Sequence, residues 1–180
     1  PTLYGTDQLG ANITTMVVSG TNLLLRCEWC KALAPSSIDA VSLYLIDGAT
    51  PPPGVTATHY DGTQTTPDSA LVAAFAAQGK TYTDTLTGVA YSVVSVPAGT
   101  TQGFPRVVAQ IRGIKVRTTS GGSYAYSDNP VWLIAWLLTE RLGSSIDWSS
   151  FATAAAVCDA LVGSPSEKKY TIGLSMDTEQ

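Results

Sequence analysis

Residues 126–162 constrain the fold more than any other stretch, because helix caps and apolar spacing agree over its whole length. Asn129 is a good N-cap, and Pro130 stands at the first helical position, where its missing N–H costs nothing. The pattern predicts a helix that runs to Leu142 and ends at Gly143 in a left-handed conformation. Its expected apolar stripe consists of Val131, Ile134, Ala135, Leu138 and Leu142.

A second helix is predicted directly after this one. Asp147 can cap it from about Trp148, and Gly163 is placed to end it. Its expected shared face consists of Phe151, Ala155, Cys158 and either Leu161 or Val162. Two antiparallel helices joined by a loop of about four residues form a helical hairpin, whose apolar stripes need a third surface to cover them. Trp132, Trp136 and Trp148 are its expected anchors, in the core or against another subunit, with core packing favoured.

The rest of the chain is rich in β patterns. Residues 1–11 are expected to form an extended arm, and residues 12–18 and 22–30 a β-hairpin around Ser19-Gly20-Thr21. Further strands are predicted at residues 37–46 (ended by the Asp47-Gly48 turn), 88–96, 106–118 and 168–176. The sequence therefore predicts an α+β fold: a β-rich domain of antiparallel strands over residues 12–125, followed by the helical hairpin and a strand over 126–180. A further helix is expected to begin at Asp177-Thr178, where the sequence ends.

Residues 49–66 are expected to form a long exposed loop, because they combine three consecutive prolines with six threonines and little periodicity. The only histidine, His59, lies there beside Tyr60, and a lone loop histidine is more often exposed than catalytic. One short additional helix is predicted over residues 67–78, with Gly79 as its stop. Its alanine-rich stripe around Leu71 should pack closely against a sheet.

The strand at residues 106–118 shows a phase slip and carries the most basic segment of the chain. Apolar residues stand at 107, 109 and 111 and then at 114 and 116, so a β-bulge or two-residue turn is expected at Arg112-Gly113. The basic residues are Arg106, Arg112, Lys115 and Arg117. A nucleic-acid groove would interleave such charges with aromatic residues, and this segment has none. It is interpreted as a solvated strand face or a face that meets an acidic neighbouring chain.

Cys27 and Cys30 form a C-x-x-C motif that could be a redox pair or half of a zinc site. Redox pairs lie at helix N-termini, whereas this motif falls in a predicted strand, and no second pair supplies further zinc ligands. On a regular strand the two side chains point to opposite faces, so one is expected in the core and the other near the strand end. The cysteines are interpreted as small hydrophobic residues.

Composition limits the functions that need to be considered. The chain has 180 residues and a net charge of −4, and only 13% of its residues are charged, about half the usual fraction. The charge argues against nonspecific nucleic-acid binding, and the charge-poor surface could be buried against partner chains or kept soluble by hydroxyl groups. No apolar run is long enough to span a membrane, and no signal peptide is recognised. Because the sequence begins with Pro1, it is expected to be a processed product or a fragment.

No catalytic or cofactor-binding motif is found. The sequence contains no G-x-S-x-G, no phosphate-binding loop and no histidine cluster, so no catalytic residue, metal or cofactor is expected. Carboxylate pairs remain open because acidic residues are scattered along the chain, which keeps a cell-envelope hydrolase as the least favoured alternative. A binding module that contacts a receptor or partner through residues 49–66 is the other alternative.

Three segments resemble the central tail-hub proteins of tailed bacteriophages, which include the tip attachment or host-specificity proteins of lambda-like phages and the hubs of gene transfer agents. They are NLLLRCEWCKA at residues 22–32, GVAY with GFPR and IRG between residues 88 and 113, and SDNP with LLT, ID, SFA and CD between residues 127 and 159. The order and spacing of these motifs agree with the family. The chain departs from it in having Leu142-Gly143-Ser144-Ser145 where the family often has Tyr-Gly-Leu-Gly, and in being shorter.

The resemblance implies a structural role in the virion, at the tip of the phage tail. Such hubs are homotrimers that close the tail tube, contact other tail proteins and support host attachment. They also open to let DNA pass. A pore of this kind need not be strongly basic, because DNA should slide through it. The residues expected to take part in interactions are Trp132, Trp136, Trp148, Arg112, Lys115, Arg117, His59 and Tyr60.

Overall fold

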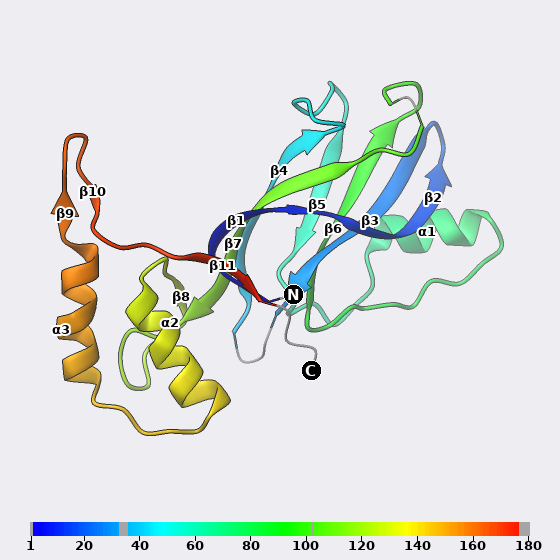
Figure 1. Ribbon diagram of the computed structural model, residues 1–180. Coiled ribbons are helices and arrows are strands. Elements are labelled where there is room, and N and C mark those ends of the chain that lie inside the picture. Colours follow the sequence, from blue (N-terminus) through cyan, green and yellow to red (C-terminus); the bar gives the residue numbers. More distant parts are fainter. Residues whose placement is uncertain (1, 33–35, 102, 177–180) are drawn as a thin grey trace.

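The computed structural model describes residues 2–32, 36–101 and 103–176 and has a mixed α+β fold built on antiparallel sheets (Figure 1). One sheet has the strand order β11-β1-β7-β4, with β8 paired to β7, and the other has the order β2-β3-β6-β5. The strands of the two sheets are β1 (Thr2–Gly10), β2 (Asn12–Ser19), β3 (Asn22–Lys31), β4 (Ile38–Ile46), β5 (Thr56–Tyr60), β6 (Val89–Pro97), β7 (Val107–Val116), β8 (Ala125–Tyr126) and β11 (Gly173–Met176). This arrangement confirms the predicted fold class.

The two sheets share one core, and we call β1 to β7 with their connections the β sandwich. Side chains on β3 and β6 alternate as expected for strands. Leu25, Cys27 and Val94 face the core shared with the other sheet, whereas Leu24 and Val93 face the opposite side. The two central strands of the second sheet, β3 and β6, are therefore buried on both of their faces.

Helix α1 (Ser69–Ala77) covers the outer face of that second sheet (Figure 1). It begins later than predicted, because the side chain of Asp68 accepts a hydrogen bond from the N–H of Leu71 and makes Asp68 the N-cap. Leu71 and Ala74 are buried against β2, β3 and β6, which agrees with the predicted alanine-rich contact. Gly79 adopts a φ of 70°, so the predicted stop is also confirmed.

Two predictions for the first half of the chain are wrong in detail. Residues 2–10 are no free arm, since they form β1 between β7 and β11, with Leu3 and Tyr4 buried. Residues 49–66 are no continuous loop, because β5 runs through them and pairs with β6. The threonines and the alanine of β5 are compatible with an edge strand. The strand was not predicted because it is short and follows a cluster of prolines that shows no periodicity. The β2–β3 hairpin, by contrast, lies where it was predicted.

The phase slip on β7 has a different cause from the predicted bulge. The pairing of β7 with β4 passes through Arg112 without a register shift, and the register shifts instead on β4, between Leu43 and Leu45. At Gly113, β7 ceases to pair with β1, whose Leu3 backbone crosses so closely that a Cβ on Gly113 would collide with it. Apolar residues therefore appear on both faces of β7 because both faces are covered there.

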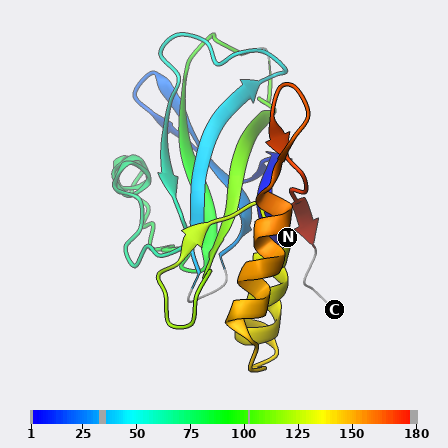
Figure 2. The same cartoon turned by 90° about the vertical axis from the view of Figure 1, so that its left-hand side faces the viewer.

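The helical hairpin consists of α2 (Pro130–Trp136), its π-helical extension η1 (Leu137–Arg141) and α3 (Trp148–Asp159). Figure 2 shows α2 and α3 side by side at one edge of the sandwich. Asn129 and Asp147 cap the two helices as predicted, each accepting a hydrogen bond from a backbone N–H two residues on. Gly143, with a φ of 63°, follows the first helix.

The predicted stripe on the first helix is wrong at two of its positions, although Ala135 is buried and Val131 packs against the core as expected. Ile134 is 50% exposed and Leu142 is 71% exposed, whereas Trp132, Leu133, Ala135 and Trp136 are buried. The two tryptophans stand four residues apart and cover more apolar area than the aliphatic positions, so they determine which face packs. On α3, Ala155 and Cys158 are buried as predicted.

The second helix ends earlier than predicted, at Asp159. The residues after it form a small two-stranded element, the β9–β10 finger, in which β9 (Leu161–Val162) pairs with β10 (Glu167–Lys168). Gly163, with a φ of 82°, lies in this finger and does not close the helix. The predicted strand at 168–176 is split accordingly into β10 and β11, and the helix predicted from Asp177 lies outside the described residues.

Candidate interaction surfaces

Strands β4 and β5 lie at the free edges of the two sheets and line a shallow cavity of about 360 Å³ between them. Ile38, Asp39 and Val41 contribute from β4, and His59, Tyr60 and Asp61 contribute from β5 and the residue after it. One backbone hydrogen bond, from the N–H of Ile38 to the carbonyl of Asp61 (3.0 Å), joins the two edges at one end. We call this gap the seam.

His59 is exposed at the seam, and its ring is held by a buried hydroxyl. Its Nδ1 lies 2.7 Å from Oγ of Ser92, which also accepts a hydrogen bond from the indole N–H of Trp29 (2.7 Å). Because an indole nitrogen can only donate, Ser92 accepts from Trp29, and its own hydrogen is available to Nδ1 in the tautomer of His59 that carries its proton on Nε2. Partial burial of the ring lowers the pKa of His59, so the neutral form prevails at pH 7. Ser92 is fully buried, which excludes it as an accessible nucleophile.

Tyr60 has a structural environment on the other side of the same strand. Its ring stacks on Tyr91 with a centroid distance of 4.5 Å, and its hydroxyl donates to Asp68 (2.7 Å). Burial, followed by this contact with Asp68, raises the pKa of Tyr60 to about 12. His59 and Tyr60 both line the seam. The hydroxyl of Tyr60 also links β5 to Asp68, the N-cap of α1.

The basic residues of β7 meet acidic and aromatic partners within the chain. Arg112 pairs with Asp39 (3.1 Å) and lies over the ring of Tyr126 (4.0 Å to the centroid). Arg117 approaches Glu140 (3.6 Å) and lies over the ring of Tyr124 (4.5 Å). The aromatic residues that the segment itself lacks are thus supplied by the residues around β8, a contact that sequence spacing could not show.

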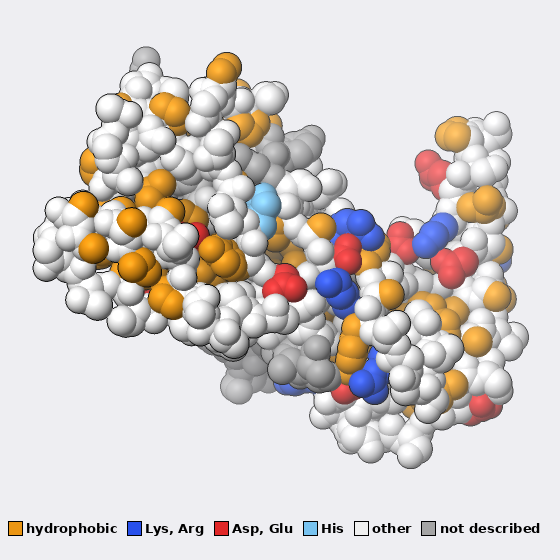
Figure 3. All heavy atoms as spheres, turned by 180° about the vertical axis from the view of Figure 1, so that it is seen from behind, with side chains coloured by type: hydrophobic (Ala, Val, Ile, Leu, Met, Phe, Trp, Pro, Cys, Tyr) orange, Lys and Arg blue, Asp and Glu red, His pale blue; other side chains and the backbone are white. Residues whose placement is uncertain are grey.

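Two further lysines also have polar partners within the chain. The amine of Lys115 bonds the hydroxyl of Ser37 (3.3 Å), and Lys168 bridges Asp128 (2.7 Å) and Asp159 (3.2 Å). Figure 3 shows Lys and Arg side chains next to Asp and Glu side chains where the sandwich meets the hairpin. This mixed surface lacks the uniformly positive field that a nucleic-acid groove requires.

The three tryptophans of the hairpin take part in packing within the chain. Trp136 donates its indole N–H to Ser36 (3.0 Å) and meets the ring of Tyr4 edge to face, with a centroid distance of 5.3 Å. Trp132 is 8% exposed and lies in the same core. Trp148 is partly exposed and packs against that core. The contacts of Trp132 and Trp136 are those of core residues, the alternative favoured from sequence.

Cys27 and Cys30 are both buried in the core between the sheets, so the prediction of opposite faces is wrong. The register between β3 and β6 shifts from Glu28 to Cys30, and the extra residue, Trp29, turns Cys30 back to the face of Cys27. Burial raises the pKa of both thiols to about 12, which suppresses the reactive thiolate form. The described part of the chain contains no group of three or more His, Cys, Asp or Glu that could hold a metal ion.

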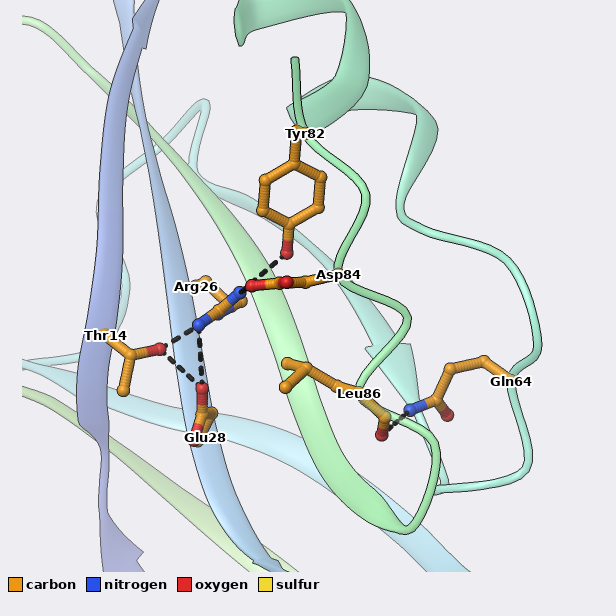
Figure 4. A network of polar contacts seen from close by, with 7 residues as sticks. All are labelled: Thr14, Arg26, Glu28, Gln64, Tyr82, Asp84 and Leu86. Carbon is orange, nitrogen blue, oxygen red and sulfur yellow. Dashed lines mark hydrogen bonds and ion pairs between the residues drawn. The ribbon is translucent and has the colours of Figure 1, made fainter. Parts of the chain in front are cut away.

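A buried arginine is the polar site that the sequence reasoning missed. Figure 4 shows the Arg26 guanidinium between Thr14, Glu28, Tyr82 and Asp84, with distances of 2.8 to 3.1 Å to these partners. Hydrogen bonds to Tyr82 and Asp84 outweigh the desolvation of Arg26 and raise its pKa. The contacts tie the segment after α1 to the outer face of the sheet. The sequence feature that could have indicated this site is an arginine inside the apolar run of β3.

Five exposed apolar side chains lie on the hairpin and the finger, while others, such as Met16, Val18 and Phe104, lie on the sandwich. The set consists of Ile134, Leu142, Val157, Leu161 and Val162, which are 48% to 71% exposed. Hydrophobic side chains come to the surface along this region in Figure 3. We call this set the exposed apolar set.

No model of a protein family, no curated protein and no solved structure matches this chain. Within the described ranges, none of the helices has the length and apolar character needed to cross a membrane.

Proposed function

We propose that this chain is a structural component of a phage tail tip, a part of the central hub that assembles as a homotrimer. In this role it closes the tail tube, contacts other tail proteins, supports host attachment and lets DNA pass on ejection. The observation that carries the proposal is the exposed apolar set on the hairpin and finger, which a further protein surface would cover.

The residues that carry the resemblance to tail hubs make packing and capping contacts, which supports a structural role for the chain. Asn129, from the SDNP motif, caps α2 and donates its side-chain amide to the carbonyl of Ala155 on α3 (2.9 Å). Arg26 and Cys27, from the NLLLRCEWC motif, tie the sheet to its covering segment and fill the core. These motif residues hold elements together, as expected for a scaffold.

The charge distribution is compatible with a tube through which DNA moves. The net charge is −4, and Arg112, Arg117 and Lys168 have acidic partners, so phosphate groups would meet little uncompensated positive charge at these residues. Weak attraction is what a passage for DNA requires.

The oligomeric state in solution tests the proposal. Size-exclusion chromatography with light scattering is expected to give three times the chain mass of 18.8 kDa. Replacing Val157 and Leu161 together by Lys should give the monomer mass without unfolding the chain, because both side chains are exposed. Val72→Lys, at a 37% exposed apolar position on α1, is the matched control and should leave the mass unchanged. A monomeric wild type at high concentration would contradict the proposal.

A further inference from the structure

The backbone edges of β4 and β5 turn toward the same seam. The N–H of Ile38 points into it, since it bonds the carbonyl of Asp61 there. Successive strand residues alternate the side to which they turn their N–H and C=O groups. Ala40 and Ser42 on β4 therefore face the seam.

The same alternation applies to β5, with Ala57 and His59 facing the seam. Hydrogen bonds on the opposite sides of the two strands agree with this assignment. The carbonyl of Ser37, next to Ile38, accepts from the N–H of Lys115 on β7, and the carbonyl of Gly62, next to Asp61, accepts from the N–H of Gly88 next to β6. Across the described ranges, no backbone hydrogen bond joins residues 39–45 with residues 56–60. The seam is thus lined by backbone donors and acceptors from both sheets.

Neither edge has a strong barrier to another strand. Natural edge strands are often protected by lysine, proline or a bulge. β5 (TATHY) has none of these. On β4 the register shifts only between Leu43 and Leu45, so residues 38–42 remain regular.

Charge at the seam is already balanced. The carboxylate of Asp39 is paired with Arg112, and that of Asp61 accepts from the hydroxyl and the N–H of Thr63. Burial raises the pKa of Asp61, but these hydrogen bonds and the charge of Lys115 outweigh it and lower the pKa. A charged ligand finds no unpaired opposite charge among these groups, whereas a neutral peptide backbone matches the row of N–H and C=O groups.

We infer that the seam accepts a short extended segment of another polypeptide, about four residues long, which pairs with Ala40 and Ser42 on one side and Ala57 and His59 on the other. The added strand would join the two sheets where only the Ile38–Asp61 bond joins them in the free chain. One of its uncharged side chains would enter the cavity of about 360 Å³. This inference does not rest on the tail-tip role.

Hydrogen exchange of the free protein gives the first test. The amides of Ala40, Ser42, Ala57 and His59 should exchange quickly, whereas the amide of Thr58, which faces β6, should be protected. Protection of all five amides in the free protein would contradict the inference, because the seam would already be closed.

Peptide selection gives the second test. A display library of random uncharged decapeptides is selected on the wild type and counter-selected on Ala57→Pro. This variant removes a seam-facing N–H while leaving the bonds to β6, as proline permits on an edge strand. Enriched peptides should bind Ala57→Pro at least about tenfold more weakly, as expected for lost hydrogen bonds. They should also slow exchange at the four amides.

Two controls make the outcome decisive. Thr58→Pro should lower the melting temperature, because its N–H faces β6, and Ala57→Pro should melt close to the wild type. The selected peptide, N-methylated at alternate residues, should lose binding. Absence of enrichment, equal binding to Ala57→Pro, or binding that survives N-methylation at either set of alternate residues would overturn the inference. Pairing of two copies at the seam without added peptide would overturn the assignment to a separate polypeptide.

Discussion

The β sandwich and the helical hairpin differ in how completely they bury their own apolar residues. In the sandwich, Leu25 and Ile111 are fully buried between the sheets, and Leu71 on α1 is fully buried on the outer face. On the hairpin, only the face with Trp132 and Trp136 is covered, and the exposed apolar set remains at the surface. The sandwich is closed between its sheets, although Met16, Val18 and Phe104 remain exposed on its outside, whereas the hairpin and finger leave the exposed apolar set for another surface to cover.

The largest expected difference between the two regions is the cost of removing a leucine. Leu25→Ala should lower the free energy of unfolding by about 2–5 kcal/mol, because it leaves a cavity between the sheets. Leu161→Ala, at a 67% exposed position, should change it by less than about 0.5 kcal/mol. Urea unfolding measures both. Similar costs at the two positions would show that the finger is part of the core, against the comparison drawn above.

The second prediction concerns the polar contacts of the sandwich. Arg26→Met should cost about 3 kcal/mol, because it leaves the partly buried Glu28 and the hydroxyl of Tyr82 without their partner. Asp84→Asn should cost less than about 1 kcal/mol, since the Asp84 side chain is 60% exposed. Thermal unfolding of the two variants distinguishes a buried from a surface contribution. The reverse order would contradict the assignment of Arg26 as the centre of the network.

The third prediction concerns the junction of the two helices. Asn129→Ala should cost about 2 kcal/mol, because it removes both the cap of α2 and the buried hydrogen bond to Ala155 of α3. Asp147→Ala removes a cap of the same kind at an exposed site and should cost less. Chemical unfolding followed by far-UV circular dichroism measures the pair. Equal losses would mean that the contact to Ala155 contributes nothing.

The smallest expected effect is a pH dependence of α3. Hydrogen bonds from Ser150 and Ser149 lower the pKa of Asp147 to about 2. Because this pKa lies below its unfolded value of about 3.9, the contribution is present above pH 4 and is lost as the pH falls toward 2. Melting curves between pH 2 and pH 6 should show this loss in the wild type and not in Asp147→Asn. The same slope in both would exclude Asp147 as its source.

Local signals predicted a large part of this fold. The caps Asn129 and Asp147, the stop at Gly79 and the turn at Asp47-Gly48, where φ is 52° and 82°, lie where the sequence placed them. Each depends on a few neighbouring residues and a specific backbone conformation, so spacing alone was sufficient.

The features that could not be predicted depend on long-range contacts. The face of α2 was misplaced because the pocket that receives Trp136 is formed by Ser36 and Tyr4, far away in the sequence. The face of Cys30 was predicted wrongly because the bulge at Trp29 exists only in the pairing of β3 with β6. The seam could not be seen at all, since it requires knowing that β4 and β5 end different sheets.

The dependence of the melting temperature on protein concentration tests the central claim, that the hairpin presents a surface for assembly, most directly. If copies associate through the exposed apolar set, mass action stabilises the folded chain as the concentration rises. The wild type should then melt at a temperature that increases with concentration, and the variant with Val157→Lys and Leu161→Lys should not. A melting temperature of the wild type that is independent of concentration, and equal to that of the variant, would contradict the account.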